Sequence, residues 1–401
     1  MKDFSRINEL LDSYKQEMIE TMRQMISIKA ISPKSGGSGE AVRAQFLEKL
    51  LNSWGFPTKR YDYNDDTGTV RPNIITAMGN SKSTIWFVAH MDTVSEGDPK
   101  LWKSDPFTLK VDGDILYGRG VNDDGHGLIA SMYAMRALKD SGAAVKYNFG
   151  LALVADEEIG SRYGMSKLVD EDIFKKGDMF IVPDWGSKDG SLIEIGEKGL
   201  LWLKVTVIGK QVHASTPDLG KNAFRYSMRF LAQVDSMLHS KYTARNNVFN
   251  PDVSTFEMTK HEKNVDSVNI IPGVDVFYID CRILPDYNMS EVVSSVKQIA
   301  SSAEFKEVKI EVEEANRQDP APITDPNSDI VRLLDSSVTE LRKVKTRKLG
   351  IGGATCAEFA RKKGFQAAVW GTQADVAHQP NEYSDINEII ADAKVFAHML
   401  I

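Results

Sequence analysis

Several apolar segments of this chain end in side chains that can bind a metal ion. In chain order these side chains are His90, Asp92, Glu157, Glu158 and Asp184. Carboxylates crowded at the end of a buried strand repel one another, and a bound cation relieves that repulsion. A carboxylate two residues after a ligating histidine can also fix the tautomer of that histidine. Taken singly, each motif is more typical of a capped loop or a solvated turn, but their conjunction indicates a metal site.

Two further segments carry candidate ligands. The glycine-rich turn 118–127 holds Asp123 and Asp124 ahead of a predicted helix, and the loop after 366–370 holds His378. The turn lacks the lysine and the glycine spacing of a phosphate-binding loop. On their own, the two aspartates could simply cap the helix. As metal ligands, however, they bring the carboxylates above the number that one ion needs, which suggests two ions sharing a bridging aspartate.

Short apolar strands alternate with helices in two parts of the chain. The expected strands are 84–89, 147–155, 179–182 and 366–370, and the expected helices are 8–28, 40–54, 127–138, 328–341, 354–363 and 386–400. This alternation predicts an α/β sheet with both faces covered. Because open α/β sheets place their sites at the carboxyl ends of strands, the candidate ligands are expected to meet at one edge.

The pattern between these two parts is different. Strands are expected at 200–208, 253–258, 274–284 and 308–313, and helices at 222–238 and 290–301. The order βαββαβ is that of a split, ferredoxin-like unit. We therefore expect an inserted domain over 199–315 and a discontinuous catalytic domain made of 1–198 and 316–401.

Composition excludes several classes of protein. The chain has 401 residues and a formal net charge of -7, so it lacks the basic surface that nucleic acid or an anionic membrane would require. Its apolar runs are far shorter than the roughly 18 residues of a membrane span, and the polar N-terminus does not resemble a signal peptide. Two cysteines, Cys281 and Cys356, cannot form a disulfide framework. We expect a cytoplasmic enzyme that acts on a small molecule.

Eight segments together resemble a known family. They are HMDTV (90–94), GRGVNDDGHG (118–127), DEEIGS (156–161), GKQVHASTPDLGKNA (209–223), VNIIPG (268–273), DCRILP (280–285), GGATCAEFA (352–360) and HQPNEY (378–383). Over nearly its whole length the chain is similar to the zinc aminoacylase, carboxypeptidase G, acetylornithine deacetylase and succinyl-diaminopimelate desuccinylase family of co-catalytic metallopeptidases. The resemblance implies a zinc-peptidase-like mixed sheet flanked by helices, with an inserted ferredoxin-like dimerisation domain, and hence a homodimer.

The resemblance also implies a ligand set for two divalent metal ions. These ions would be zinc, with cobalt or manganese as possible substitutes. Asp123 would bridge the two ions. His90 and Asp184 would complete one site, and Glu158 and His378 would complete the other.

Catalytic and substrate-binding roles follow in the same way. Glu157 would be the general base, Asp92 would orient His90, and His213 would reach the partner subunit's active site to stabilise the oxyanion. The residues expected to hold the substrate's carboxylate end are Arg282, Asn269, Gly352, Gly353 and Thr355.

Some of these residues could instead have purely structural roles. His213 could be a surface histidine, Arg282 could form a structural ion pair with Asp280 or Asp275, and the glycines at 352–353 could form a turn that leads into a helix.

The turn at 118–127 departs from the family pattern. Gly125 and His126 stand where the family commonly has lysine and glycine. His126 is not expected to bind metal, because it begins the helix beyond the turn. Trp185, directly after Asp184, is expected either to shape a pocket or simply to pack.

The implied reaction is the hydrolysis of an N-acyl amino acid, of the acetylornithine or N-succinyl-diaminopimelate type, by a metal-bridging water. A di- or tripeptidase or a carboxypeptidase of the same family is the alternative. A non-catalytic metal-binding protein on this fold is a more remote alternative, because Glu157 and all the candidate ligands are present.

Overall fold

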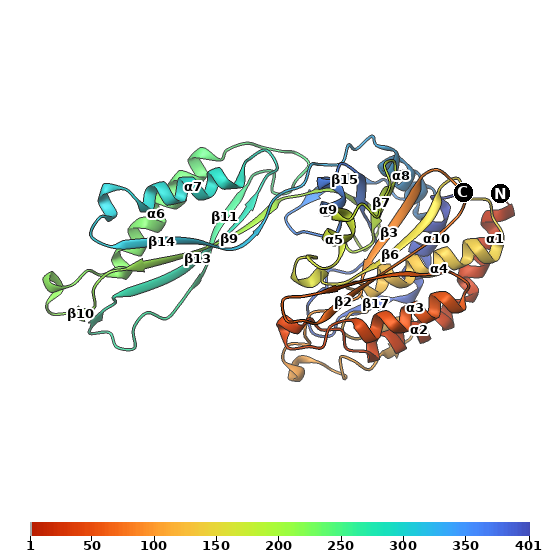
Figure 1. Cartoon of the computed structure of the whole chain (residues 1–401), viewed down its shortest axis with the longest axis horizontal. Helices are drawn as coiled ribbons and strands as arrows, with labels where there is room; N and C mark the ends of the chain where they lie inside the picture. The colour runs from red at the N-terminus through yellow and green to blue at the C-terminus, as the bar shows by residue number, and fades with distance from the viewer. Residues whose placement is uncertain (1) are drawn as a thin grey trace. The chain divides into compact units, whose positions relative to one another are not determined.

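The computed structural model describes residues 2–401, which form two compact units. The first unit comprises the residues up to Ile195, Thr324–Leu349 and Thr355–Ile401, and the second comprises Gly196–Ile323 and Gly350–Ala354. Each unit has a sheet of its own (Figure 1).

The second unit differs in extent from the insert expected over 199–315. It continues to Ile323, because strand β14 (Lys309–Gln318) is longer than the strand expected there. It also includes Gly350–Ala354, which we expected in the catalytic domain. The amide of Gly350 donates to the carbonyl of Val248 at 2.6 Å, which ties this short segment to the second unit.

The first unit is built on a mixed sheet, as the family resemblance implied, and this sheet has eight strands. In spatial order its strands are β1 (Lys59–Asn64), β2 (Val70–Met78), β6 (Asn148–Val154), β3 (Thr84–His90), β7 (Met179–Val182), β16 (Gln366–Val369), β8 (Leu192–Glu197) and β15 (Arg347–Ile351). The central strands β6, β3, β7 and β16, which are the four that the sequence pattern predicted, run parallel, whereas β1, β2 and β8 pair antiparallel.

Helices flank this sheet (Figure 1). They are α1 (Lys2–Ser13), α2 (Lys15–Ser27), α3 (Ala41–Ser53), α4 (Gly125–Ser141), α5 (Met165–Asp170), α8 (Asp329–Arg342), α9 (Ala357–Lys362) and α10 (Ile386–His398). A small separate sheet contains β4 (Lys110–Asp112), β5 (Ile115–Tyr117) and β17 (Tyr383–Asp385). Short 3₁₀ helices lie at Pro33–Ser35, Pro99–Leu101, Glu157–Ile159, Pro217–Leu219 and Ala303–Phe305.

Both faces of the large sheet are covered, which explains why its central strands are apolar throughout. All seven residues of β3 are buried. On one face, Phe87 stacks on Phe149 with ring centroids 4.4 Å apart and contacts Phe396 of α10 at 4.9 Å. On the other face, Trp86 and Val88 share a core cluster with residues of α5 and α9.

The N-terminal region differs from the sequence prediction in two ways. The single helix expected over 8–28 is two helices, α1 and α2, with a turn at Tyr14 between them. The Tyr14 hydroxyl donates to Asp140 at 2.6 Å, which holds the break against α4. Strands β1 and β2 were not predicted, because the polar residues Arg71 and Asn73 interrupt the apolar pattern of β2.

The second unit has the predicted βαββαβ order. Its elements are β9 (Gly199–Ile208), α6 (Ala223–Lys241), β11 (Thr255–His261), β13 (Val274–Ile283), α7 (Met289–Ala300) and β14. The sheet is antiparallel, in the order β11-β13-β9-β14, and the alternate residues of β9 that point inward form a core with both helices. A short pair, β10 (Val212–His213) and β12 (Ile270–Ile271), lies outside this sheet.

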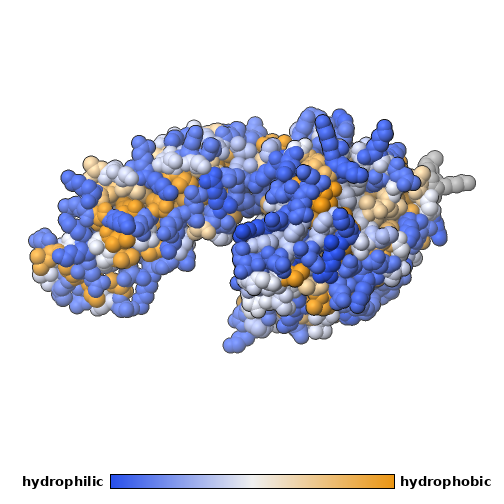
Figure 2. Space-filling view, in the orientation of Figure 1, coloured by the Kyte–Doolittle hydropathy of each residue, from blue (hydrophilic) through white to orange (hydrophobic). Residues whose placement is uncertain are grey.

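The face drawn in Figure 2 is mostly hydrophilic, with apolar areas on both units. The exposed large apolar side chains of the second unit are Trp202, Leu219, Phe224, Met228, Met258, Val268 and Val274. In the described part of the chain, no helix has both the length and the apolar character that a membrane crossing requires.

Candidate active site

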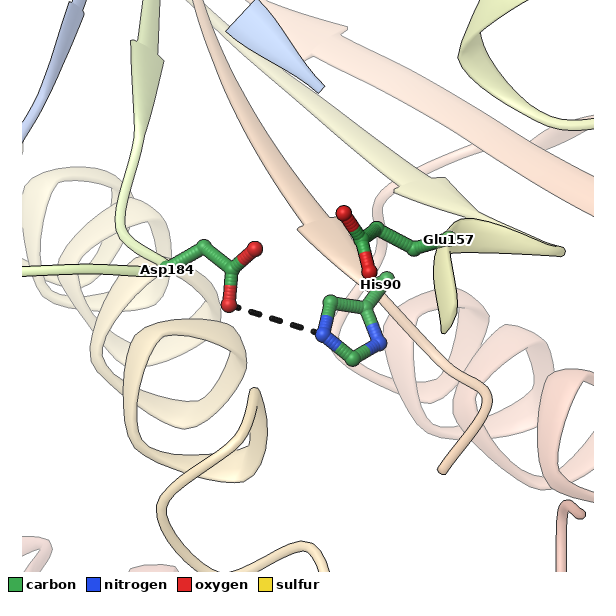
Figure 3. Close-up of side chains that lie close together, drawn as sticks. All are labelled: His90, Glu157 and Asp184. Atoms are coloured by element: carbon green, nitrogen blue, oxygen red, sulfur yellow. Dashed lines mark ion pairs between the residues drawn. The ribbon is translucent and has the colours of Figure 1, made fainter. Parts of the chain in front are cut away.

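The candidate ligands of the first unit lie at the carboxyl ends of its parallel strands. His90 is the last residue of β3, whereas we expected it one residue past the strand, and it is in register with Val154 at the end of β6. Figure 3 shows that Glu157 and Asp184, which follow β6 and β7, point toward His90. The parallel register therefore brings three separate strand ends to one place.

His90 and His378 each face two carboxylates. Nε2 of His90 lies 2.8 Å from Oδ1 of Asp123 and 3.5 Å from Oδ1 of Asp184. Nε2 of His378 lies 3.0 Å from Oδ2 of Asp123 and 3.0 Å from Oε2 of Glu158. The two carboxylate oxygens of Asp123 therefore face two different imidazole rings.

The His90–Asp184 separation of 3.5 Å suits two ligands that share a metal ion, whereas the other three pairs, at 2.8 to 3.0 Å, are at hydrogen-bond distance. Two ligands that each lie about 2.0–2.2 Å from a tetrahedral ion are roughly 3.3–3.6 Å apart. His90 belongs to two groups of potential ligand atoms, one with Glu157 and Asp184 and one with Asp123 and Glu158, and the atoms of each group lie within 4.8 Å of one another. Every donor is an imidazole nitrogen or a carboxylate oxygen, a set that Zn²⁺ and similar ions accept. The residues present therefore fit divalent metal.

The charge balance of the site points the same way. Burial, together with the neighbouring Asp123 carboxylate, raises the pKa of Glu158 to about 7. Burial also raises the pKa of Glu157 well above its ordinary value, with added repulsion from Asp184. Hydrogen bonds to Asp123 and Glu158 raise the pKa of His378 to about 10. The cluster thus holds more negative charge than its surroundings stabilise, and bound cations would relieve this excess.

Asp92 makes contacts that the sequence did not predict. Nδ1 of His90 lies 3.0 Å from the backbone carbonyl of Asp92, whereas the nearest oxygen of the Asp92 carboxylate is 3.6 Å away. The carboxylate instead accepts from the backbone amides of Glu157 at 3.0 Å and Glu158 at 3.2 Å. Asp92 therefore connects the His90 segment with the two glutamates after β6.

A buried arginine also stabilises the loop that carries Glu157 and Glu158. Arg71 of β2 is fully buried, and its guanidinium lies 3.0 Å from Asp156 and 2.8 Å from Glu40. Asp156 has a left-handed backbone, with φ of 68°, and accepts from the amide of Tyr163 at 2.9 Å. These contacts fix the turn from which Glu157 projects.

The turn between β5 and α4 resolves two questions that the sequence left open. The Asp124 carboxylate accepts from the backbone amide of His90 at 3.1 Å and does not cap α4. His126 is buried between Ser384, 2.7 Å from its Nδ1, and Asp392, 3.0 Å from its Nε2. Both ring nitrogens therefore have protein partners, in line with the expectation that His126 is not a ligand.

His213 and Asn269 are neighbours in the second unit. His213 lies on β10, where it pairs with Ile270, and Asn269 accepts through its carbonyl from the amide of Ala214 at 2.8 Å. Both residues are exposed. The amide of Ser215 donates to Nδ1 of His213 at 3.1 Å, so the neutral imidazole carries its proton on Nε2.

Arg282 forms the ion pair that the sequence left as an alternative. Its guanidinium donates to both carboxylate oxygens of Asp280, at 2.8 and 3.1 Å, and to the carbonyl of Gly352 at 2.7 Å. Gly353 follows in the same segment of the second unit, whereas Thr355 belongs to the first unit. The Thr355 hydroxyl accepts from the amide of Ala357 at 3.1 Å, at the start of α9.

Sequence reasoning missed several residues that position the site. They are Arg43, Arg71, Arg119 and Glu382, all of them buried. Arg43, for example, donates to the backbone carbonyl of Met91 at 2.8 Å. Arg119 and Glu382 lie within the motifs at 118–127 and 378–383, but nothing in those motifs indicated that the two side chains pair; Arg43 and Arg71 lie outside the motifs.

Relatives of the chain are found along its whole length. It is 36% identical to an uncharacterized metallohydrolase from Methanocaldococcus jannaschii, over 96% of this chain and 99% of that protein. It is 25% identical to a succinyl-diaminopimelate desuccinylase from Pelagibacter ubique, over 95% of this chain and 97% of that protein.

Solved structures share its fold. A di-peptidase from Saccharomyces cerevisiae superposes with a TM-score of 0.77 at 18% identity, covering 100% of this chain and 98% of that chain. An M20 family metallo-carboxypeptidase from Sulfolobus solfataricus gives 0.76 at 20% identity, covering 96% and 98%.

A family model also matches most of the sequence. The match to peptidase family M20/M25/M40 covers residues 86–401 and includes every candidate metal ligand. With the metallohydrolase relative and the shared fold, we conclude that the chain belongs to peptidase family M20/M25/M40 and is a metallohydrolase of amide or peptide bonds.

Proposed function

We propose that this enzyme is a two-metal deacylase that removes the acyl group from an N-acyl amino acid. The observation that best supports two metal ions is the orientation of Asp123, whose two carboxylate oxygens lie 2.8 and 3.0 Å from the imidazole nitrogens of different histidines. A bridging carboxylate needs this arrangement. His90 and Asp184 complete one site, Glu158 and His378 complete the other, and zinc is the expected metal, with cobalt or manganese as substitutes.

When bound, the ions would lower the pKa of a water molecule and polarise the substrate carbonyl. Glu157 accepts a proton from that water and later delivers it to the leaving amine, which is general base and then general acid work. Its backbone is held by Asp92 and by the turn at Asp156.

His213 is proposed as the donor to the oxyanion. The Ser215 amide occupies Nδ1, which leaves the Nε2 proton to point outward from an exposed ring. Arg282, with Gly352, Gly353 and Thr355, is proposed to hold the free carboxylate of the substrate. Arg282 would do so while paired with Asp280, a partner that fixes the plane of its guanidinium. Asn269 lies beside His213, ahead of β13, whereas Arg282 is near the end of that strand, so Asn269 would act, like His213, from the partner subunit.

The N-acyl amino acid class is supported by the sequence relatives. The succinyl-diaminopimelate desuccinylases align over more than nine-tenths of this chain, at 25% to 27% identity. The solved peptidases are less than 25% identical, so they support the fold without selecting a substrate. A di- or tripeptidase is therefore kept as an outcome of the test.

The first experiment measures amine release from a panel of N-acetyl and N-succinyl amino acids and of di- and tripeptides. The enzyme is assayed with added Zn²⁺ or Co²⁺ and again after chelation. We expect metal-dependent release from the N-acyl substrates. Release from peptides alone would replace the deacylase proposal with a peptidase, and release that survives complete chelation would contradict the metal mechanism.

A homodimer is proposed as well, joined through the second unit. Phe224 and Met228, spaced one helical turn apart on α6, are 40% and 51% exposed, so α6 presents two adjacent apolar side chains that a partner could cover. In this dimer His213 would serve the partner's active site.

Substituting His213 tests the cross-subunit role. H213A is expected to lower kcat by roughly 10²–10³-fold, the loss typical of one oxyanion donor, with bound metal unchanged. Mixing H213A with E157A should restore part of the activity, because a hybrid dimer contains one site with both residues intact. Absence of recovery, when subunit exchange has been demonstrated by tagged copies, would contradict the role of His213 in the partner's site.

A further inference from the structure

Glu382 is a buried carboxylate that the proposed mechanism does not use. It is 0% exposed, and both of its carboxylate oxygens accept hydrogen bonds from the turn that carries Asp123. Oε1 accepts from the backbone amides of Asn122 at 2.8 Å and Asp123 at 3.1 Å. Oε2 accepts from the guanidinium of Arg119 at 2.7 Å and from the amide of Gly120 at 3.0 Å. The side chain thus serves as a template for the backbone of this turn.

The same residue lies four positions after His378, so it joins the two ligand-bearing segments. Arg119, which pairs with Glu382, also donates to the backbone carbonyl of His378 at 3.2 Å. The Asn122 side chain donates to the carbonyl of Ala374 at 2.9 Å, at the other end of the loop. These contacts hold the His378 loop against the Asp123 turn.

His378 depends on this support, because little packs around its ring. Its side chain is 57% exposed, and its backbone has a left-handed φ of 63°. Asn381, also left-handed, donates to the carbonyl of Leu101 at 2.9 Å and accepts from the amide of Lys103 at 2.8 Å. Left-handed backbone at residues other than glycine persists only where the surrounding contacts enforce it.

We propose that Glu382 is a positioning residue that sets the spacing between Asp123 and His378. Through them it would fix the ligand geometry of the ion that these two residues share with Glu158. The inference rests on the proposed two-metal function. A glutamine at position 382 would have the same size, but its amide nitrogen would meet donors where a carboxylate oxygen now accepts, so the template would lose part of its contacts.

Metal titration of the apo-enzyme tests this inference. Zn²⁺ binding is followed by calorimetry and Co²⁺ binding by its visible absorption, in wild type, in E382Q and in the control E194Q. Glu194 is a matched control because it too is a buried carboxylate, paired with Arg361 at 2.9 and 3.0 Å in the first unit. We expect E382Q to bind one ion about 10–100-fold more weakly, the usual loss when a partner of a metal ligand is removed, and E194Q to bind both like wild type.

Two further measurements separate positioning from general stability. Hydrogen exchange of the apo-enzyme should be faster in E382Q over 374–382, with the core strands unchanged. If E382Q does not fold, R119Q provides the test, because it keeps the contacts of Glu382 to the backbone amides and removes the bond to the His378 carbonyl. R119Q is expected to weaken the same single ion.

The possible outcomes are distinct. Wild type that binds no divalent ion would overturn the proposed function and this inference together. Wild type that binds two ions, with E382Q or R119Q binding both equally well, would overturn this inference alone. Equal weakening in E382Q and E194Q would show a general effect of losing a buried ion pair and would also overturn it.

Discussion

Glu157→Gln is expected to lower kcat by roughly 10²–10⁴-fold, the usual contribution of a general base, while bound metal stays at the wild-type level. Glutamine keeps the size of the side chain but cannot accept the proton of the attacking water. The backbone amide of Glu157 would still donate to Asp92, because the substitution leaves the main chain unchanged. Turnover of the best panel substrate and metal content per chain are measured on the same preparation.

The adjacent Glu158 supplies the matched comparison. Glu158→Ala removes the oxygen that lies 3.0 Å from His378, so we expect the loss of one ion along with the loss of rate. The comparison is informative because both glutamates belong to groups of potential ligand atoms around His90. If E157Q lost metal and E158A kept it, the assignment of base and ligand would be reversed.

Asp123→Ala is expected to have the second large effect, because it removes an oxygen from each ion at once. We expect weakened binding of both ions and a fall in kcat/KM of about 10³-fold or more. The reason is that a metal ion stabilises the transition state by several kcal/mol. Metal stoichiometry after dialysis and initial rates at limiting Zn²⁺ measure the two parts of this effect.

Asp124 is the control for this prediction. It is the next residue, it is equally part of the turn, and its carboxylate contacts the amide of His90 instead of facing an imidazole ring. Asp124→Asn keeps an oxygen that can accept this bond, so both ions are expected to remain. An Asp123→Ala protein that bound two ions with wild-type affinity would contradict the bridging role.

Local patterns in the sequence predicted the four central parallel strands of the large sheet, the βαββαβ unit and the position of the candidate ligands. Apolar runs such as 84–89 and 179–182 are recognisable because strands buried on both faces have no polar side to interrupt them. The ends of those runs place His90 and Asp184 at one sheet edge, since neighbouring parallel strands end together. The helix expected over 8–28 shows the limit of such patterns, because it is broken at Tyr14, whose hydroxyl donates to the distant Asp140.

Tertiary structure alone decided how the candidate ligands face one another and what supports them. Asp123 and Glu382 are 259 positions apart in the sequence, and no local pattern indicates that one would hold the backbone of the other. The same holds for Arg71, whose partners Glu40 and Asp156 come from separate segments. Buried charges are stable only where they pair with opposite charges or hydrogen-bonding groups. The packing of the whole unit decides which of these groups lie within reach.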